Sequence, residues 1–222
     1  MNEQTPLVVA NLKANKTWDE TSAWLDEVGP ISKDFSGTIV LCPSAPFLAS
    51  THLSLITNHL SLKLGSQDIS RFEQGAYTGE VAASQIASIC QYTIIGHSER
   101  RQNFKENDEI LFEKVKNTQK AGLEIIYCVQ SENDEIPDDV KVVAYEPVFA
   151  IGTGNPDTPE NAKTIAEKLK ARGEYTILYG GSVNSENVKS YLSKGLIDGV
   201  LVGATNSLDP EKFIGILKSA AY

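Results

Sequence analysis

The sequence predicts a single-domain α/β protein, a (β/α)8 barrel in which eight parallel strands alternate with helices across residues 1–222. Strand-like and helix-like segments alternate with little slack between them, which is typical of a parallel sheet. Most strand segments are continuous apolar runs, as expected for strands that are buried on both faces. The length suits one large domain, because ~250 residues are typical of a closed barrel of this kind. From the pattern alone, an open doubly wound sheet remains the alternative.

The eight expected strands are short segments rich in Val, Ile and Leu. In chain order they are Leu7–Lys13, Thr38–Cys42, Leu62–Ser66, Tyr92–Gly96, Glu124–Val129, Lys141–Glu146, Thr176–Gly180 and Gly199–Gly203. In such barrels the functional residues lie at the C-terminal ends of the strands. The residues that end or follow these segments are therefore the candidates for a functional site.

Four of the intervening helices have recognisable starts, each with a polar cap residue and an early acidic residue. They begin at Thr17-Trp18-Asp19-Glu20, Asp157-Thr158-Pro159-Glu160, Asn184-Ser185-Glu186 and Asp209-Pro210-Glu211. In the second of these, the proline stands in the first turn, where its missing N–H costs nothing.

One connection is too short for a helix. Only Gln130 to Val140 separates the fifth strand from the sixth, and the segment contains Pro137 and a run of acidic residues. A complete crossover between parallel strands needs at least about 10–12 residues including its helix. We therefore expect seven full helices around the barrel and a gap after the fifth strand, covered by a loop or by a partner subunit.

Composition excludes several classes of protein. The formal net charge of −9 is the opposite of the balance expected for a nucleic-acid-binding protein. No apolar run approaches the ~18 residues of a membrane span. Met1 to Gln4 lack the basic start and apolar core of a signal peptide, so a cytoplasmic location is expected.

The three cysteines are expected to be buried, reduced thiols. Cys42, Cys90 and Cys128 form no CxxC pair and no metal-binding spacing, and each lies in or beside an apolar run.

The segment from Ala144 to Gly154 is the most informative part of the chain. A β-branched run from Val140 to Val143 leads to Glu146, a proline and then a loop rich in glycine and small residues. A lone glutamate at a strand end is commonly the partner of a salt bridge. Here the flanking residues favour a general base under a loop that closes and excludes water, which strengthens a carboxylate base.

His97 follows the fourth strand and precedes Ser98-Glu99-Arg100-Arg101, which reads as the first turn of a helix. A single histidine at a strand end is often structural. A helix N-terminus disfavours a positive imidazole, however, and a neutral ring can donate a hydrogen bond that polarises a carbonyl group.

Asn11 and Lys13 end the first strand, and the period of two places both side chains on one side. The plain interpretation of Lys13 is a solvated strand-end lysine. The functional one is a fixed positive charge for an oxyanion and a phosphate group, with Asn11 as a polar neighbour.

Three glycine-containing loops predict a phosphate site. Gly180-Gly181-Ser182 follows the seventh strand, Val202-Gly203-Ala204-Thr205-Asn206 follows the eighth, and Gly152 lies in the loop after Glu146. Barrels commonly bind phosphate in the loops after strands seven and eight. Gly-Gly-Ser alone is a weak signal, and its position at a strand end strengthens it.

Taken together, these motifs resemble the triosephosphate isomerase family from about Val8 to Pro210. The motifs that carry the resemblance stand in the family's order: Asn11-Leu12-Lys13, Gly96-His97-Ser98-Glu99-Arg100, Ala144 to Gly154 and Tyr179-Gly180-Gly181-Ser182. The resemblance implies a TIM barrel that interconverts dihydroxyacetone phosphate and glyceraldehyde 3-phosphate, a reaction of glycolysis and gluconeogenesis. This family is itself the standard example of a glutamate base beside a neutral histidine, so that pairing rests on the resemblance.

The resemblance also implies that no metal and no organic cofactor is needed, because the carbonyl group and its α-hydrogen belong to the substrate. It implies a role for each site residue as well. Glu146 moves the proton between two carbons, His97 serves the enediol oxygens, and Lys13 and Asn11 stabilise negative charge. Glu99 and Ser98 support them, with Glu99 as the counter-ion of Lys13. The phosphate group is bound by the N–H groups of Gly152, Ser182, Gly203 and Ala204.

A homodimer is implied too, because residues 65–80 resemble the family's long third loop, with Thr78 at a tip that enters a second subunit. The chain departs from the family where Phe149 replaces a tryptophan and Ala204 replaces a glycine, and in the missing fifth helix. Two alternatives remain: another phosphosugar isomerase barrel, and an impaired barrel that serves as a scaffold or binding protein.

Overall fold

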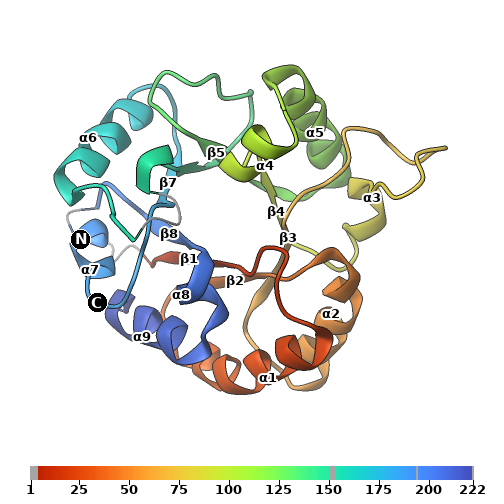
Figure 1. The fold of residues 1–222 in the computed structure, drawn as a ribbon, viewed down its shortest axis with the longest axis horizontal. Coiled ribbons are helices and arrows are strands. Elements are labelled where there is room, and N and C mark those ends of the chain that lie inside the picture. The colour runs from red at the N-terminus through yellow and green to blue at the C-terminus, as the bar shows by residue number, and fades with distance from the viewer. Residues whose placement is uncertain (1–4, 151–153, 194, 222) are drawn as a thin grey trace.

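Eight parallel strands close into a barrel in the computed structural model, which describes residues 5–150, 154–193 and 195–221 (Figure 1). Each strand pairs with its neighbours in sequence, and β1 pairs with β8, so the barrel prediction is confirmed and the open sheet is excluded. The strands are β1 (Leu7–Asn11), β2 (Thr38–Cys42), β3 (Lys63–Ser66), β4 (Tyr92–Ile95), β5 (Glu124–Val129), β6 (Val142–Tyr145), β7 (Thr176–Tyr179) and β8 (Gly199–Val202).

Successive strand residues belong to two separate apolar layers, because side chains alternate across a strand. On β1, Val9 belongs to the smaller cluster, whereas Val8 and Ala10 belong to the larger cluster that also contains helix residues. The smaller cluster therefore fills the barrel, and the larger one lies between the strands and the helices. Continuous apolar runs in the sequence follow from this double burial.

Helices surround the barrel in chain order. They are α1 (Trp18–Val28), α2 (Leu48–Thr57), α3 (Ala83–Ile86), α4 (Ser98–Asn103), α5 (Asp108–Ala121), α6 (Pro159–Lys170), α7 (Val188–Leu192), α8 (Ala204–Leu208) and α9 (Pro210–Ala220), with short 3₁₀ turns at Pro30–Lys33, Ala45–Phe47 and Val148–Ala150. No helix in the described ranges combines the length and the apolar character needed to cross a membrane.

Three of the four expected helix starts are confirmed. Thr17, Thr158 and Asp209 each cap a helix by accepting a hydrogen bond from a backbone N–H of its first turn. The start expected at Asn184 is wrong, because α7 begins only at Val188. The Asn184 side chain instead accepts hydrogen bonds from the N–H groups of Glu186 and Asn187, both at 2.9 Å, and so closes a turn before the helix.

The gap after β5 is confirmed: the chain runs from Gln130 to Lys141 without a helix. The expectation of seven full helices elsewhere is wrong in detail. α3 has only four residues and α7 only five, so two further sides of the barrel carry a single helical turn.

The connector itself, residues 130–141, covers the barrel wall at this gap. Val140 is buried, and Ile136 packs against the outer apolar layer. Neighbouring helices hold the connector in place. Arg172, just past α6, donates to the carbonyl oxygens of Glu132 and Asp134, and Gln119 of α5 donates to that of Asp138 at 2.8 Å. Of the two coverings considered, the loop is the one observed.

Candidate active site

A cavity of about 390 Å³ opens at the C-terminal ends of the strands. The predicted residues that line it are Asn11, Lys13, His97, Glu146, Ser182, Gly203 and Ala204. Gly152 lies outside the described residues. Ser98 and Glu99 do not line the cavity, but both contact residues that do. Residues separated by almost 200 positions in sequence therefore meet in one pocket because parallel strands end on one face.

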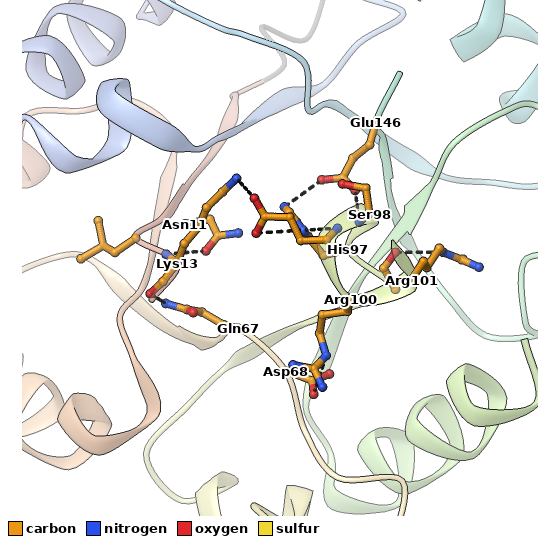
Figure 2. A network of polar contacts seen from close by, with 12 residues as sticks. Asn11, Lys13, Gln67, Asp68, His97, Ser98, Arg100, Arg101 and Glu146 are labelled. Carbon is orange, nitrogen blue, oxygen red and sulfur yellow. Dashed lines mark hydrogen bonds and ion pairs between the residues drawn. The ribbon is translucent and has the colours of Figure 1, made fainter. Parts of the chain in front are cut away.

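Glu146 belongs to a polar network that Figure 2 shows from close by, where it contacts His97 and Ser98. It follows β6 and is 1% exposed. One carboxylate oxygen, Oε2, accepts a hydrogen bond of 2.8 Å from the backbone N–H of Ser98, and Oε1 lies 3.1 Å from Nε2 of His97. The Ser98 hydroxyl is buried without a hydrogen-bond partner among the described residues, so Ser98 supports Glu146 through its backbone.

His97 is the cap residue of α4, and this position fixes its tautomer. Its Nδ1 accepts a hydrogen bond of 3.2 Å from the backbone N–H of Glu99. An accepting Nδ1 carries no proton, so the ring proton is on Nε2, the atom that faces Glu146. The imidazole is then neutral and presents an N–H donor at the cavity.

Lys13 stands just past β1 in a left-handed backbone conformation, with φ of 53°. Its Nζ lies 2.5 Å from Oε1 of Glu99, as the family resemblance implies. Asn11 accepts a hydrogen bond of 3.0 Å from the Lys13 N–H, which fixes the turn that aims the ammonium group at the cavity.

Gln67 is a positioning residue that the sequence reasoning missed. Its amide donates to the carbonyl oxygen of Lys13 at 2.8 Å and to that of Cys42 at 2.9 Å (Figure 2). It thereby ties the loop after β3 to the left-handed turn after β1. The only available signal was its place directly after the third strand, which does not distinguish it from a solvent-exposed glutamine.

Two loops form the end of the cavity predicted to bind phosphate. Ser182 and Ala204 both have left-handed backbones, with φ of 49° and 52°. Such residues are typical of tight turns whose N–H groups converge on an anion. The side chain of Asn206 joins the two loops by donating to the carbonyl oxygen of Val183 at 2.7 Å. Thr205 and Asn206, which belong to the predicted loop after the eighth strand, line this end as well, together with Asn184, which the predicted site did not include.

Glycine is required at two places where backbone approaches a site side chain. A Cβ atom on Gly180 would lie 3.0 Å from Cγ of Glu146, and one on Gly203 would lie 3.1 Å from Cε of Lys13. Both distances are tighter than ordinary contacts, so the side chain of Glu146 or Lys13 would have to shift to accommodate a larger residue.

The cysteines are buried as expected, and Cys128 lies inside the barrel near Glu146. Burial raises the pKa of the Cys128 thiol well above its usual range, and the negative charge of Glu146 raises it further. This thiol is therefore a packing group and not a nucleophile. Within the part of the chain that the structure describes, no group of three or more His, Cys, Asp or Glu side chains is placed to hold a metal ion.

Comparisons with known proteins point to one family. The triosephosphate isomerase family profile matches residues 6–220. The chain is 37% identical to the triosephosphate isomerase of Hahella chejuensis, over 96% of this chain and 98% of that one. It is 38% identical to that of Thermodesulfovibrio yellowstonii, over 95% and 98% of the two chains, and 35% identical to that of Aquifex aeolicus, over 96% and 98%. This protein therefore belongs to the triosephosphate isomerase family.

Proposed function

We propose that this protein interconverts dihydroxyacetone phosphate and D-glyceraldehyde 3-phosphate, with Glu146 as the base, His97 as the proton donor and Lys13 as the fixed cation. The observation that carries the proposal is the meeting of these three side chains in one cavity. Oε1 of Glu146 lies 3.1 Å from Nε2 of His97, and Lys13 lines the same pocket.

The reaction moves one proton between neighbouring carbons. Glu146 takes a proton from the carbon beside the carbonyl group, and the electron pair shifts toward the carbonyl oxygen. The Nε2–H of His97 hydrogen-bonds to that oxygen and supplies the proton that gives an enediol. Glu146 then returns its proton to the other carbon, while Nε2 of His97 takes back a proton from the second hydroxyl group, which becomes the new carbonyl group. Both residues regain their starting protonation, and one substrate carbon is oxidised as its neighbour is reduced, so the scheme requires no external redox agent.

Electrostatics at the site fit an anionic substrate. The chain as a whole carries a formal charge of −9, so attraction must be local. Among the described residues that line the cavity, Lys13 is the only lysine or arginine. It stabilises the charge that develops on the oxygen, and the N–H groups of the loops containing Ser182, Gly203 and Ala204 bind the phosphate group. Gly152 is proposed to contribute from the loop after Glu146.

A coupled assay of glyceraldehyde 3-phosphate isomerisation tests the proposal. Glu146→Gln removes the base but keeps the size of the side chain, so kcat should fall by about 10²- to 10⁴-fold. Glu160→Gln, an exposed acid at the start of α6, is the matched control and should leave kcat unchanged. A folded wild-type protein without activity, or a Glu146→Gln variant as fast as wild type, would favour the scaffold alternative.

The protein is further proposed to be a cytoplasmic, single-domain homodimer whose loop 65–80 lies at the interface. This loop projects from the side of the barrel before α3 (Figure 1). Its Phe72 and Tyr77 rings stack with centroids 4.0 Å apart, and Tyr77 is 44% exposed, so the loop is stiffened and presents an aromatic surface. In sedimentation analysis the wild type should be dimeric and Tyr77→Arg monomeric, and a monomeric wild type would contradict the proposal.

A further inference from the structure

Asp157 is a buried carboxylate on the outer side of the barrel, where the segment that leaves Glu146 returns to the start of α6. It is 6% exposed. Lysine and arginine are absent from its hydrogen-bond partners in the described structure, which are the side chains and N–H groups of polar residues. Burying a carboxylate costs free energy unless its oxygens accept hydrogen bonds. The groups that surround Asp157 therefore indicate its role.

Three tyrosine hydroxyl groups and a side chain of α6 form hydrogen bonds with Asp157. Its Oδ2 accepts hydrogen bonds from the Tyr145 hydroxyl at 3.3 Å and from the Asn161 amide at 2.7 Å. Its backbone N–H donates to the Tyr179 hydroxyl at 2.8 Å, and its carbonyl oxygen accepts from the Tyr191 hydroxyl at 2.5 Å. One residue thus connects β6, β7, α6 and α7.

The tyrosines form a compact aromatic cluster around it. The rings of Tyr179 and Tyr191 stack with centroids 4.0 Å apart, and those of Tyr145 and Tyr179 lie 6.4 Å apart. Burial raises the pKa of Tyr145, and the negative charge of Asp157 raises it further. The Tyr145 hydroxyl therefore stays protonated and acts as a donor toward the carboxylate.

Two of these tyrosines stand directly before active-site residues. Tyr145 precedes Glu146, and Tyr179 precedes Gly180 at the start of the loop that contains Ser182. Tyr145 and Tyr179 are also register partners in the β6–β7 ladder. Alternation along a strand places the tyrosines on the outer face and the residues after them on the inner face. Asp157 therefore contacts, on the outer side of the barrel, the last residue of β6 and the last residue of β7. These two residues directly precede the base and the phosphate loop.

We propose that Asp157 is a positioning residue that fixes the end of β6, which carries the base, relative to the end of β7, which carries the phosphate loop. The inference rests on the proposed role of Glu146. Only 3.0 Å would separate Cγ of Glu146 from a Cβ atom on Gly180, so a small relative shift of the two strand ends changes the distance between base and phosphate loop. Asp157 acts through Tyr145 and Tyr179 and does not touch the substrate.

Asp157→Asn tests this inference. An asparagine keeps the shape but accepts hydrogen bonds on only one of its two side-chain atoms, so either the Thr158 N–H or both Tyr145 and Asn161 lose their acceptor. We expect kcat for isomerisation to fall roughly tenfold, because displaced reacting groups lose their alignment.

A second readout separates positioning from loss of folded protein. A poorly held enediol intermediate breaks the bond between its carbon and the phosphate oxygen. The electron pair leaves with inorganic phosphate, a hydroxyl group of the enediol gives up its proton to become a carbonyl group, and the resulting three-carbon enol tautomerises to methylglyoxal. Phosphate released per isomerisation should therefore rise in Asp157→Asn. A variant that merely folds less well lowers both rates equally and leaves this ratio unchanged.

Two matched controls address stability. Thr158→Ala removes the neighbouring helix cap, and Asp198→Asn changes a second buried carboxylate, which lies before β8 at the opposite end of the barrel. Both should lower stability and leave the ratio of phosphate release to isomerisation at the wild-type value.

If Asp157→Asn does not fold, Tyr145→Phe removes one of the two donors to Oδ2 and leaves Asn161 in place, and it should raise the same ratio. A wild-type ratio in a folded Asp157→Asn or Tyr145→Phe variant would overturn the inference. Failure of the proposed function would look different, because the wild type itself would then be inactive or Glu146→Gln would retain full activity.

Discussion

Ala204 adopts a left-handed backbone, with φ of 52°, in the loop after β8. A Cβ atom is unfavourable in this conformation, and glycine adopts it freely. Ala204→Gly should therefore raise the free energy of unfolding by about 1 kcal/mol, even though it removes a side chain. Urea denaturation followed by circular dichroism measures this change.

Gly122 ends α5 in the same left-handed region, with φ of 77°. Replacing it by alanine tests the opposite substitution, from glycine to alanine. A Cβ atom there would meet nothing within 4 Å, so Gly122→Ala changes only the conformational preference. It should lower the free energy of unfolding by about 1 kcal/mol. If Ala204→Gly were destabilising while Gly122→Ala behaved as expected, the methyl group of Ala204 would be contributing packing that outweighs its conformational cost.

At the level of residues, the sequence predicts the side chains that directly follow strands. The meeting of Glu146, His97 and Lys13 in one cavity could be predicted because each ends or follows a strand, and the C-terminal ends of barrel strands lie on one face. The contacts of Gln67, Asn206 and Asp157 could not be predicted, because each side chain or backbone group bonds to a residue that is distant in sequence. Such pairings depend on the closed barrel and leave no local pattern.

At the level of elements, the loop after β3 is joined to α4 and α5 by a cluster of buried charges. Lys114 is 3% exposed and contacts Asp68 at 2.6 Å and Glu106 at 2.7 Å, and Arg100 contacts both carboxylates. Burial raises the pKa of Asp68 from its usual 3.8 to about 6. The nearby positive charge of Lys114 opposes this shift, and the negative charge of Glu106 adds to it.

This pKa predicts a particular dependence of stability on pH. Between about pH 4 and pH 6 the folded protein retains a proton on Asp68 that the unfolded chain has released, so rising pH favours unfolding. The stabilisation is present below the unfolded pKa and is lost as the pH rises through about 6. The unfolding free energy of wild type should therefore fall relative to that of Asp68→Asn, by about 3 kcal/mol over this range.

Guanidinium denaturation of both proteins at a series of pH values from 4 to 7 measures the difference. Taking the difference between the two variants cancels the titration of carboxylates that are distant from Asp68, because that titration affects both variants alike. If the unfolding free energy of wild type rose with pH relative to that of Asp68→Asn, the favourable charges of Lys114 and Arg100 would outweigh the effect of burial on Asp68.

Helix starts were predicted correctly where contacts between residues close in sequence determine them. Thr17, Thr158 and Asp209 cap helices by contacts within four residues, so a local pattern is sufficient. The start of α7 was placed too early because Asn184 can cap a turn as well as a helix, and the sequence does not say which. The shortness of α3 was missed because most of the connection between β3 and β4, residues 67–82, contains no helix, and the sequence pattern does not show this.

At the scale of the whole molecule, the barrel remains closed although one helix is missing. The β5–β6 ladder pairs four residues, from Ile126 with Val142 to Val129 with Tyr145, as many as the β6–β7 ladder. The sequence predicted both the closure and the gap, because eight strand segments and one short connection can be counted directly. It left open what covers the gap, since the contacts of Arg172 and Gln119 with the connector are long-range.

The buried thiols can report whether the connector truly closes the wall. Cys128 lies on β5 beside the gap, and Cys42 lies on β2, and both are inside the barrel. Burial raises the pKa of each thiol, so neither should react with a thiol reagent until the structure opens. If the connector seals the gap, both thiols become reactive only through global unfolding, and they should be labelled at the same rate.

Pulsed alkylation followed by mass spectrometry of the peptides measures these two rates, and two substitutions calibrate them. Arg172→Ala releases the carbonyl oxygens of Glu132 and Asp134 and should speed labelling of Cys128 selectively, because only the wall beside the connector loosens. Lys120→Ala breaks an ion pair whose two side chains are 66% and 61% exposed, and should change neither rate, because such pairs contribute little. Faster labelling of Cys128 than of Cys42 in the wild type would mean that the wall opens locally at the missing helix, and that the connector covers it without sealing it.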